Sequence, residues 1–403
     1  MPNQGAMISR RTFAQLFGAG AAYAATNPAR SLCRAAPVPA TILRGASSSV
    51  VRLNSNENPY GPSAMAMKAM TDALTLSWRY PDEHADLLVE ILTKINGVDR
   101  EQILLGDGSG EILKVCAAAF TGSSNNAKGE GVKLSTPTRG GALRSFAPGR
   151  GKMIVADPTF EAIANHAAVG GADVIKIPVT KSFAHDLTKM AAAASEGLVY
   201  ICNPNNPTAS ITPKNELRSF IAATPRDTMI LVDEAYYHYA DSADYESVIP
   251  LIKDRPNLIV ARTFSKIYGM AGLRCGYCIA QKETIQRLRP HQTWDSVNIM
   301  AIVAAIASLN DSDQVANGRR LNTETRAYVS SELKAAGYEH IPSQANFIMI
   351  DVKRPAAPLI ASLKELGVHV GRPFPALPNH LRVTIGKQTE METFLSAFRK
   401  VIA

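Results

Sequence analysis

Between residues 152 and 280 the sequence repeats one arrangement, in which a short β-branched run ends in polar residues and is followed by a segment with helical periodicity. The helical segments include 159–168 and 213–223. Strands that alternate with helices favour crossover connections, and these give a mostly parallel sheet covered by helices on both faces. The sequence therefore predicts an α/β fold here, with strands at 152–157, 172–179, 197–202, 228–233, 257–263 and 274–280.

The pattern changes after residue 282. Two long helices are predicted at 284–309 and 311–336, and they precede the strand-like runs "NFIMIDV", "VHVGRPF" and "LRVTIG" and a last helix at 389–402. This order is typical of an α+β unit. We therefore predict an N-terminal arm, a large domain and a smaller C-terminal α+β domain, at residues 37–60, 61–282 and 283–403.

The segment 121–151 within the large domain is rich in Gly, Ser, Asn and basic residues. It is long for a connection in a compact domain, so it is either disordered or a functional flap. We expect disorder.

The first 36 residues form a separate segment. The run "ISRRTFAQLFGAGAAYAATNPA" joins a twin arginine to a short Ala- and Gly-rich apolar stretch, which resembles a twin-arginine export signal. We expect export, to the periplasm; the alternative is a disordered basic tail on a cytoplasmic protein. Four of the eight net positive charges of the chain belong to this segment, and the remaining charge is too small to indicate nucleic-acid binding. The sequence predicts no membrane span.

Polar residues at three successive strand ends carry the chemistry. Asn206 follows one strand, Asp233 and Tyr236 end the next, and Lys266 follows the third, within "TFSKIYGMAGLRCGY". In an open α/β sheet ligands bind beyond the carboxyl ends of the strands, so we expect these side chains to meet. A buried carboxylate needs a cationic partner, a desolvated lysine becomes nucleophilic towards an aldehyde, and Arg274 suits a phosphate. Pyridine, aldehyde and phosphate together describe pyridoxal 5′-phosphate. No metal site is predicted, since the C-x-x-C spacing in "RCGYC" falls in a strand-like run.

Seven motifs in this order carry a resemblance to a known family: "NENPYGPS", "GDGSGEIL", "NPNNPT", "VDEAYYHY", "TFSKIYGMAGLRCGY", "SQANFIMID" and "LRVTIG". Together they resemble the fold type I, pyridoxal-phosphate-dependent aminotransferases of class I and II, in the histidinol-phosphate aminotransferase-like branch. The resemblance covers about residues 50–402. It implies transfer of an amino group from an amino acid or an amino-alcohol phosphate to a 2-oxo acid such as 2-oxoglutarate.

The resemblance also implies roles for single residues around the cofactor ring. Lys266 would bind the cofactor aldehyde covalently, and Asp233 would pair with the protonated pyridine nitrogen. Tyr236 and Asn206 would hydrogen-bond the ring's 3′ oxygen, and Phe160 would stack on the ring face. Lys266, Asp233 and Tyr236 form the predicted catalytic set.

The phosphate would be bound by backbone amides at a helix start and by hydroxyl and guanidinium groups. The residues implied are Ser109, Gly110, Glu111, Thr263, Ser265 and Arg274. Tyr80 matches the tyrosine that reaches the phosphate of the neighbouring subunit's cofactor, which implies a homodimer.

For the substrate, Arg382 matches the arginine that holds the α-carboxylate in a bidentate fork. Asn206, Arg372 and Tyr60 would complete the substrate site, with Arg372 placed to meet a second anionic group. The chain departs from the family pattern at Ala209, which stands where the family has a glycine after "NPT". That matters if the backbone there needs a positive φ.

Two alternatives stay open. The first keeps the cofactor and changes the reaction to that of a lyase, racemase or oxidase. The second is a non-catalytic binding protein with the same fold, against which the complete set of site residues argues.

Overall fold

The computed structural model describes residues 50–123, 132–133, 145–146 and 149–402. The predicted export signal and most of the segment 121–151 lie outside the described residues, so the expectations for them are not tested. Residues 51–403 form one compact unit, and the predicted boundary at residue 282 stays a prediction. None of the described helices is both long and apolar enough to cross a membrane.

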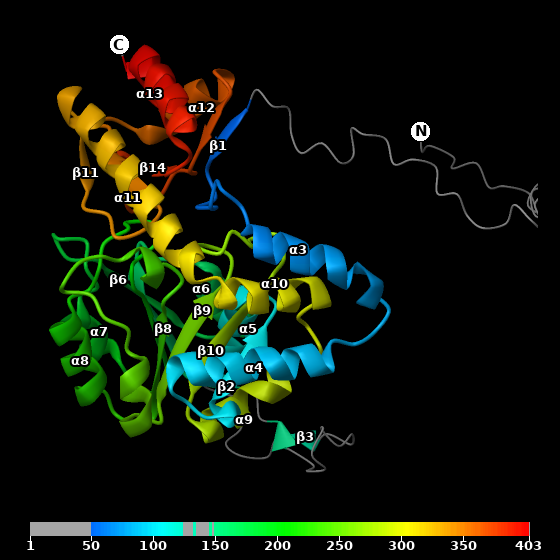
Figure 1. The fold of residues 1–403 in the computed structure, drawn as a ribbon. Helices are drawn as coiled ribbons and strands as arrows, with labels where there is room; N and C mark the ends of the chain where they lie inside the picture. The colour runs from blue at the N-terminus through cyan, green and yellow to red at the C-terminus, as the bar shows by residue number, and fades with distance from the viewer. Residues whose placement is uncertain (1–49, 124–131, 134–144, 147–148, 403) are drawn as a thin grey trace, which may run out of the picture. The chain divides into compact units, whose positions relative to one another are not determined.

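A seven-stranded sheet forms the centre of the fold (Figure 1). Neighbouring strands run parallel except β10, which is antiparallel to both β2 and β9. The predicted mostly parallel α/β sheet is therefore confirmed. In sheet order the strands are β2 (Ile103–Gly106), β10 (Gly276–Ala280), β9 (Leu258–Thr263), β8 (Thr228–Asp233), β7 (Gly197–Cys202), β5 (Lys152–Asp157) and β6 (Val174–Pro178).

Helices cover both faces of this sheet, and side chains alternate between two cores as the pleat requires. In β7, Val199 and Ile201 enter one core while Leu198 and Tyr200 enter the other. Helices of the first core are α3 (Ala64–Ala73), α4 (Asp82–Asn96), α7 (Leu187–Ala193), α8 (Lys214–Ala223) and α10 (Ile299–Asn310). Those of the second are α5 (Gly108–Phe120), α6 (Ala162–Val169) and α9 (Lys282–Leu288).

The C-terminal part has its own antiparallel sheet, in the order β11 (Glu339–Ile341), β12 (Phe347–Asp351) and β14 (His380–Thr384). A separate core joins this sheet to α11 (Ser312–Ala335), α12 (Ala356–Glu365) and α13 (Gln388–Ile402). Strand β1 (Val51–Leu53) pairs in parallel with β13 (Val368–Val370), so the start of the described chain lies beside its end (Figure 1).

Short elements connect the larger ones. A strand pair, β3 (Val132–Lys133) with β4 (Ser145–Phe146), lies in the long connection between α5 and β5. The short 3₁₀ helices are η1 (Leu74–Leu76), η2 (Arg100–Gln102), η3 (Tyr237–Tyr239), η4 (Ile249–Asp254) and η5 (Arg289–His291).

The single helix predicted at 284–309 is wrong. Helix α9 ends at Leu288, η5 follows with Pro290 in its first turn, and α10 begins only after Asn298, whose side chain accepts from the Ala301 amide. Proline lacks the amide that would continue a helix, and an asparagine N-cap starts a new one. α10 packs on α3 and α4, and thus joins the core of the central sheet.

Candidate active site

Lys266 lies in the loop after β9, at the edge of the sheet where the parallel strands end. Its Nζ is 3.2 Å from the Asn56 carbonyl oxygen and 3.4 Å from that of Ser55. Burial and the nearby Arg382 charge lower the pKa of Lys266 to about 8, although the Glu57 and Asp233 carboxylates oppose the shift. A neutral, nucleophilic fraction of the amine is therefore present near neutral pH.

Asp233 is the last residue of β8 and is buried. The Tyr200 hydroxyl donates to its Oδ2 at 2.9 Å, and the Ala235 amide donates to its Oδ1 at 3.1 Å. Burial raises the pKa of Asp233 to about 6, although both hydrogen bonds and the Lys266 charge oppose the rise. The carboxylate keeps free lone pairs for one more cationic donor.

Tyr236 and Asn206 lie beside the same lysine and arginine. The Asn56 side-chain amide donates to the Tyr236 hydroxyl at 3.0 Å, and Lys266 Nζ lies 5.5 Å from the centre of the Tyr236 ring. Asn206 Oδ1 accepts from Arg382 Nη1 at 2.7 Å. The structure thus brings together the predicted Lys266, Tyr236, Asn206 and Arg382.

The predicted phosphate residues meet at the start of α5. Arg274 has a φ of +62°, and its guanidinium is 3.4 Å from both Ser265 Oγ and the Asp107 carbonyl oxygen. Thr263 Oγ1 donates to Ser265 Oγ at 2.9 Å. A Cβ on Gly108 would lie 2.2 Å from Arg274 Nη2, so only glycine allows the guanidinium to approach this closely.

The amides of Ser109 and Gly110, in the first turn of α5, have no intrahelical acceptor, and the Asp107 side chain does not cap this helix end. The Glu111 amide is the first with a helical acceptor, the carbonyl oxygen of the N-cap residue Asp107. The Glu111 side chain accepts from the Asp107 amide and the Ser296 hydroxyl. Free amides beside a guanidinium form a phosphate site.

Arg382 extends from β14 towards the central sheet. Its Nη2 donates to the Asn54 carbonyl oxygen at 2.7 Å, while its buried Nε has no hydrogen-bond partner among the described residues. An unpaired buried donor on a guanidinium suits an incoming carboxylate.

Four predicted residues do not join this cluster. Tyr80 and Phe160 are 80% and 40% exposed, and Tyr60 is also exposed. Arg372 donates to Glu161 at 2.6 Å in an ion pair with half-exposed partners. Their predicted contacts with cofactor and substrate stay predictions.

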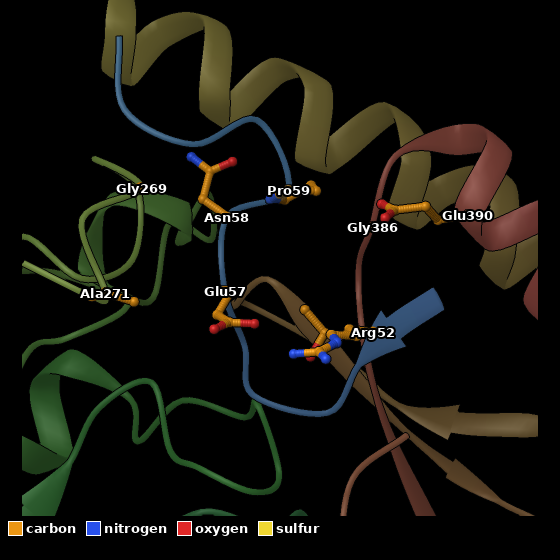
Figure 2. A pocket seen from close by; sticks show the side chains of 10 residues that line it. Arg52, Glu57, Asn58, Pro59, Gly269, Ala271, Gly386 and Glu390 are labelled. Carbon is orange, nitrogen blue, oxygen red and sulfur yellow. The ribbon is translucent and has the colours of Figure 1, made fainter. Parts of the chain in front are cut away.

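A pocket of about 320 Å³ lies next to the cluster, on the other side of the 54–59 segment. Figure 2 shows Arg52 and Glu57 between the loop with Gly269 and the segment with Gly386. Asn58 ties this segment to the lysine loop, since its side chain donates to the Ile267 carbonyl oxygen at 2.8 Å. Neither Lys266 nor Asp233 lines the pocket.

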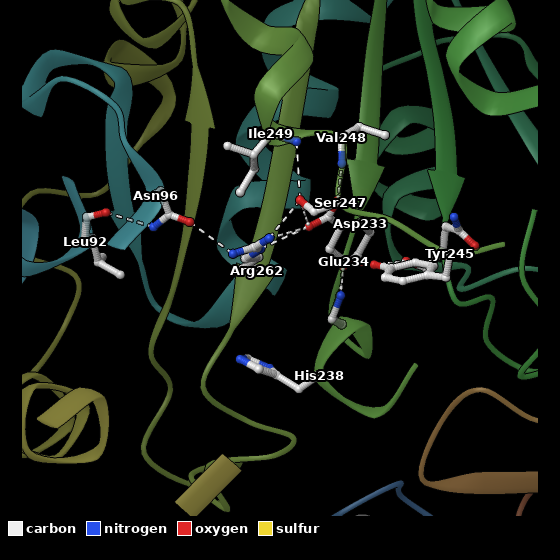
Figure 3. Close-up of polar contacts among 12 residues, drawn as sticks. Leu92, Asn96, Asp233, Glu234, His238, Tyr245, Ser247, Val248, Ile249 and Arg262 are labelled. Atoms are coloured by element: carbon white, nitrogen blue, oxygen red, sulfur yellow. Dashed lines mark hydrogen bonds and ion pairs between the residues drawn. The ribbon is translucent and has the colours of Figure 1, made fainter. Parts of the chain in front are cut away.

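A buried ion pair between Arg262 and Glu234 lies near the site (Figure 3). Arg262 is on the opposite face of the sheet from Asp233, because it follows Ala261, the strand partner of Asp233. Arg262 Nη2 and Nε donate to Glu234 Oε2 at 2.8 and 3.0 Å. Asn96 and Ser247 accept further bonds from Arg262, and the Val248 amide donates to Glu234. All three guanidinium nitrogens of Arg262 and both carboxylate oxygens of Glu234 thus have hydrogen-bond partners.

Sequence reasoning missed three contributors: Tyr200, Asn54 and Asn56. Tyr200 carries no signal in the sequence, because only the strand register places it on the same face as Cys202, the partner of Asp233 in the adjacent strand. Asn56 begins the motif "NENPYGPS", which was noted only as a family signature, and Asn54 lies two residues before it. No local signal in that motif indicates contact with residues 180 to 328 positions away.

Comparison with known proteins decides the family. The model of the family described as aminotransferase class I and II matches residues 48–398. The chain belongs to this family. The aminotransferase is 37% identical to the histidinol-phosphate aminotransferase of Moorella thermoacetica over 359 residues, which cover 88% of this chain and 86% of that protein. It is 34% identical to the histidinol-phosphate aminotransferase of Bacillus subtilis (strain 168), with 88% and 92% covered.

A solved structure adds the cofactor. The histidinol-phosphate aminotransferase of Sinorhizobium meliloti in complex with pyridoxal 5′-phosphate has a TM-score of 0.76 and 25% identity, and covers 87% of this chain and 90% of that one. The aminotransferase described here depends on the same cofactor. Its residues fit that group: free amides beside Arg274 for the phosphate, a buried carboxylate with lone pairs to spare, and a lysine that is partly neutral.

Proposed function

We propose that this aminotransferase takes the amino group of an α-amino acid or of an amino-alcohol phosphate such as histidinol phosphate, and passes it to a 2-oxo acid such as 2-oxoglutarate. The observation that carries the proposal is the contact of Arg382 with Asn206 beside Lys266, because it places an anion clamp next to the reactive amine. The names of the relatives support the phosphate-bearing donor.

Lys266 acts twice in this proposal. Its neutral amine would hold the cofactor through the aldehyde, and once released the same amine would act as the base that removes the proton from the donor Cα and as the acid that gives it back. Pyridoxal phosphate, when bound, takes up the electrons that the Cα–H bond leaves behind. A pKa of about 8 suits an amine that must accept and release one proton near neutral pH.

Asp233, Tyr236 and Asn206 orient the ring. The Asp233 carboxylate would hold the proton on the ring nitrogen, while the Tyr236 hydroxyl and Asn206 side chain would bind the 3′ oxygen. The phosphate would be held at the start of α5, at Ser109, Gly110 and Glu111, by backbone amides together with Thr263, Ser265 and Arg274. Phe160 would stack on the ring.

The donor's anionic end binds Arg382, whose unpaired Nε is available to it. Arg372 and Tyr60 shape the far end of the donor site together with the segment 121–151. Glu161 holds Arg372 in an exposed ion pair, and such pairs contribute at most about 1 kcal/mol. A doubly charged phosphate can therefore displace Glu161.

A donor panel tests the function. Amino acids and histidinol phosphate are each mixed with the purified enzyme, and conversion of the cofactor to its amine form is followed by absorbance, with 2-oxoglutarate added to regenerate it. We expect conversion with at least one donor and its reversal by the 2-oxo acid. If no donor gives the amine form, the transamination proposal is wrong, and product analysis for decarboxylation, racemisation or oxidation tests the alternative chemistry.

We also propose a homodimer in which Tyr80 reaches the neighbouring cofactor phosphate. Its support is a group of exposed apolar side chains on α3, η1 and the turn before α4, a surface that a second copy would cover. The group consists of Met65, Met67, Leu74, Trp78 and Tyr80.

Export through the twin-arginine route is the last part of the proposal. Its support is the arginine pair followed by the apolar run in residues 8–29. Fractionation of cells that express the full chain tests it. The protein should reach the periplasm, and replacement of both Arg10 and Arg11 by Lys should retain it in the cytoplasm. Equal distribution of the two forms would contradict export.

A further inference from the structure

We propose that Tyr200 is a positioning residue, whose buried hydroxyl holds the Asp233 carboxylate in the orientation that receives the protonated nitrogen of the pyridine ring. The proposal rests on the assignment of Asp233 to that nitrogen.

The strand register brings the two residues together. β7 and β8 are parallel, with Cys202 opposite Asp233 and Tyr200 opposite Leu231. Tyr200 is therefore two residues before the partner of Asp233 and on the same face of the sheet. Its long side chain spans this diagonal and places the hydroxyl 2.9 Å from Asp233 Oδ2. Both side chains are buried, at 0% and 3% exposure.

Two donors fix the carboxylate. The terminal torsion of an aspartate is broad and does not by itself select one orientation of the two oxygens. Ala235 donates to Oδ1 and Tyr200 to Oδ2, so rotation about the Cβ–Cγ bond would break both bonds. The backbone amide alone would hold one oxygen. Tyr200 is thus the side chain that determines where the remaining lone pairs point.

The donor is present at every working pH. Burial raises the pKa of Tyr200 well above its ordinary value, and the Asp233 charge raises it further. Cys202, the other titratable group on this face of β7, also stays protonated because burial raises its pKa. The charges that act on Asp233 are those of Lys266, which favours the carboxylate, and Glu234, which opposes it.

The test compares Tyr200→Phe with Tyr239→Phe. Phenylalanine keeps the ring and removes only the hydroxyl, and Tyr239 is an equally buried tyrosine in the core on the other face of the sheet. The full-length protein, freed of cofactor, is titrated with pyridoxamine 5′-phosphate between pH 5 and 8. This probe has no aldehyde, so Lys266 cannot bind it covalently and its affinity reports on Asp233.

We expect wild-type affinity to fall as the pH drops below about 6, because Asp233 is then protonated. Loss of the Tyr200 hydrogen bond removes an interaction that favours the carboxylate, so the midpoint should move upward by about one pH unit in Tyr200→Phe. Tyr239→Phe should keep the wild-type midpoint. Transamination by the reconstituted Tyr200→Phe enzyme should show the same upward shift of its acid limb.

The double variant Tyr200→Phe, Asp233→Asn shows whether Tyr200 acts through Asp233. Its pH dependence should equal that of Asp233→Asn alone. An unchanged midpoint in Tyr200→Phe, or a shift that persists when Asp233 is Asn, overturns the Tyr200 proposal. If wild-type and Asp233→Asn proteins bind the probe with the same pH dependence, the assignment of Asp233 itself is wrong and this proposal fails with it.

Discussion

The amine of Lys266 differs from an ordinary surface lysine because its surroundings remove water and add a neighbouring positive charge. We predict that borohydride reduction of the holoenzyme links the cofactor to the peptide that contains Lys266. Lys266→Ala should lose transamination while its circular dichroism stays that of the wild type. Since the pKa of Lys266 in the folded protein is about 8, below that of an ordinary lysine, covalent capture of added cofactor should rise with pH and level off above about 8. A label on another lysine would refute the mechanism.

Asp233→Asn should keep the fold and bind cofactor but lower kcat/KM by roughly 100-fold or more, because a neutral amide does not hold a proton on the ring nitrogen. Steady-state kinetics with the best donor measures this. Asp227→Asn is the control and should retain full activity, because Asp227 is exposed and lies directly before β8, at the other end of the strand from Asp233. Near-normal turnover of Asp233→Asn would favour chemistry that does not need the electron-withdrawing ring.

Single site residues could be predicted from the sequence where a charged side chain stands among apolar or small residues. An acid at the end of an apolar strand and a lysine among small residues are costly to bury without function, and both Asp233 and Lys266 were identified in this way. Tyr200 and Asn56 could not be identified, because a tyrosine in a buried strand and an asparagine in a loop conflict with nothing. Their partners become apparent only with the strand register and the long-range contacts of the fold.

At the scale of elements, the Glu234–Arg262 pair connects β8, β9 and α4 through Asn96 (Figure 3). Arg262→Met should lower the free energy of unfolding by about 3–5 kcal/mol, since it leaves the buried Glu234 carboxylate unpaired. The double variant with Glu234→Gln should recover part of this loss. Urea unfolding measures both. Arg218→Met, which removes a more exposed ion pair with Glu246, should lose at most about 1 kcal/mol.

Most strands of the central sheet agree with prediction to within two residues, because buried parallel strands appear as uninterrupted β-branched runs between polar turns. Strands β1, β2 and β11 were not predicted, because runs of three or four residues carry little periodicity. Ala209, which stands where the family has a glycine, has the positive φ that a glycine would adopt without strain. Its φ is +59°, a conformation that alanine adopts with strain, and its amide donates to the Asn205 carbonyl oxygen at 2.7 Å.

At the scale of the whole molecule, the exposed apolar group around Trp78 predicts the oligomeric state. Sedimentation velocity should give a mass of two chains, and Trp78→Glu should shift it towards one, because a charge replaces an apolar contact. Tyr80→Phe should keep the dimer but weaken cofactor binding. Val169→Glu, at another highly exposed apolar position, is the control. A wild-type monomer with full activity would rule out the shared site.

The fold class of the molecule followed from the alternation of strands and helices, and the C-terminal sheet from its three apolar runs. Less predictable was which part of the chain α10 would join. Its sequence, apolar on nearly every side, is compatible with either core. Its contacts with α3 and α4 place α10 in the core of the central sheet, and no local sequence pattern predicts these contacts.

Strand β1 has a consequence for proteolytic processing. It is held by β13, and the residues directly after it touch the reactive groups: Asn54 binds Arg382, and Asn56 binds Lys266 and Tyr236. A protease that cut between Val51 and Asn58 would leave the central sheet intact and still remove the backbone that surrounds the lysine. The contacts of Asn54 and Asn56 with the reactive groups thus limit how far the chain can be shortened from its amino terminus before the active site is lost.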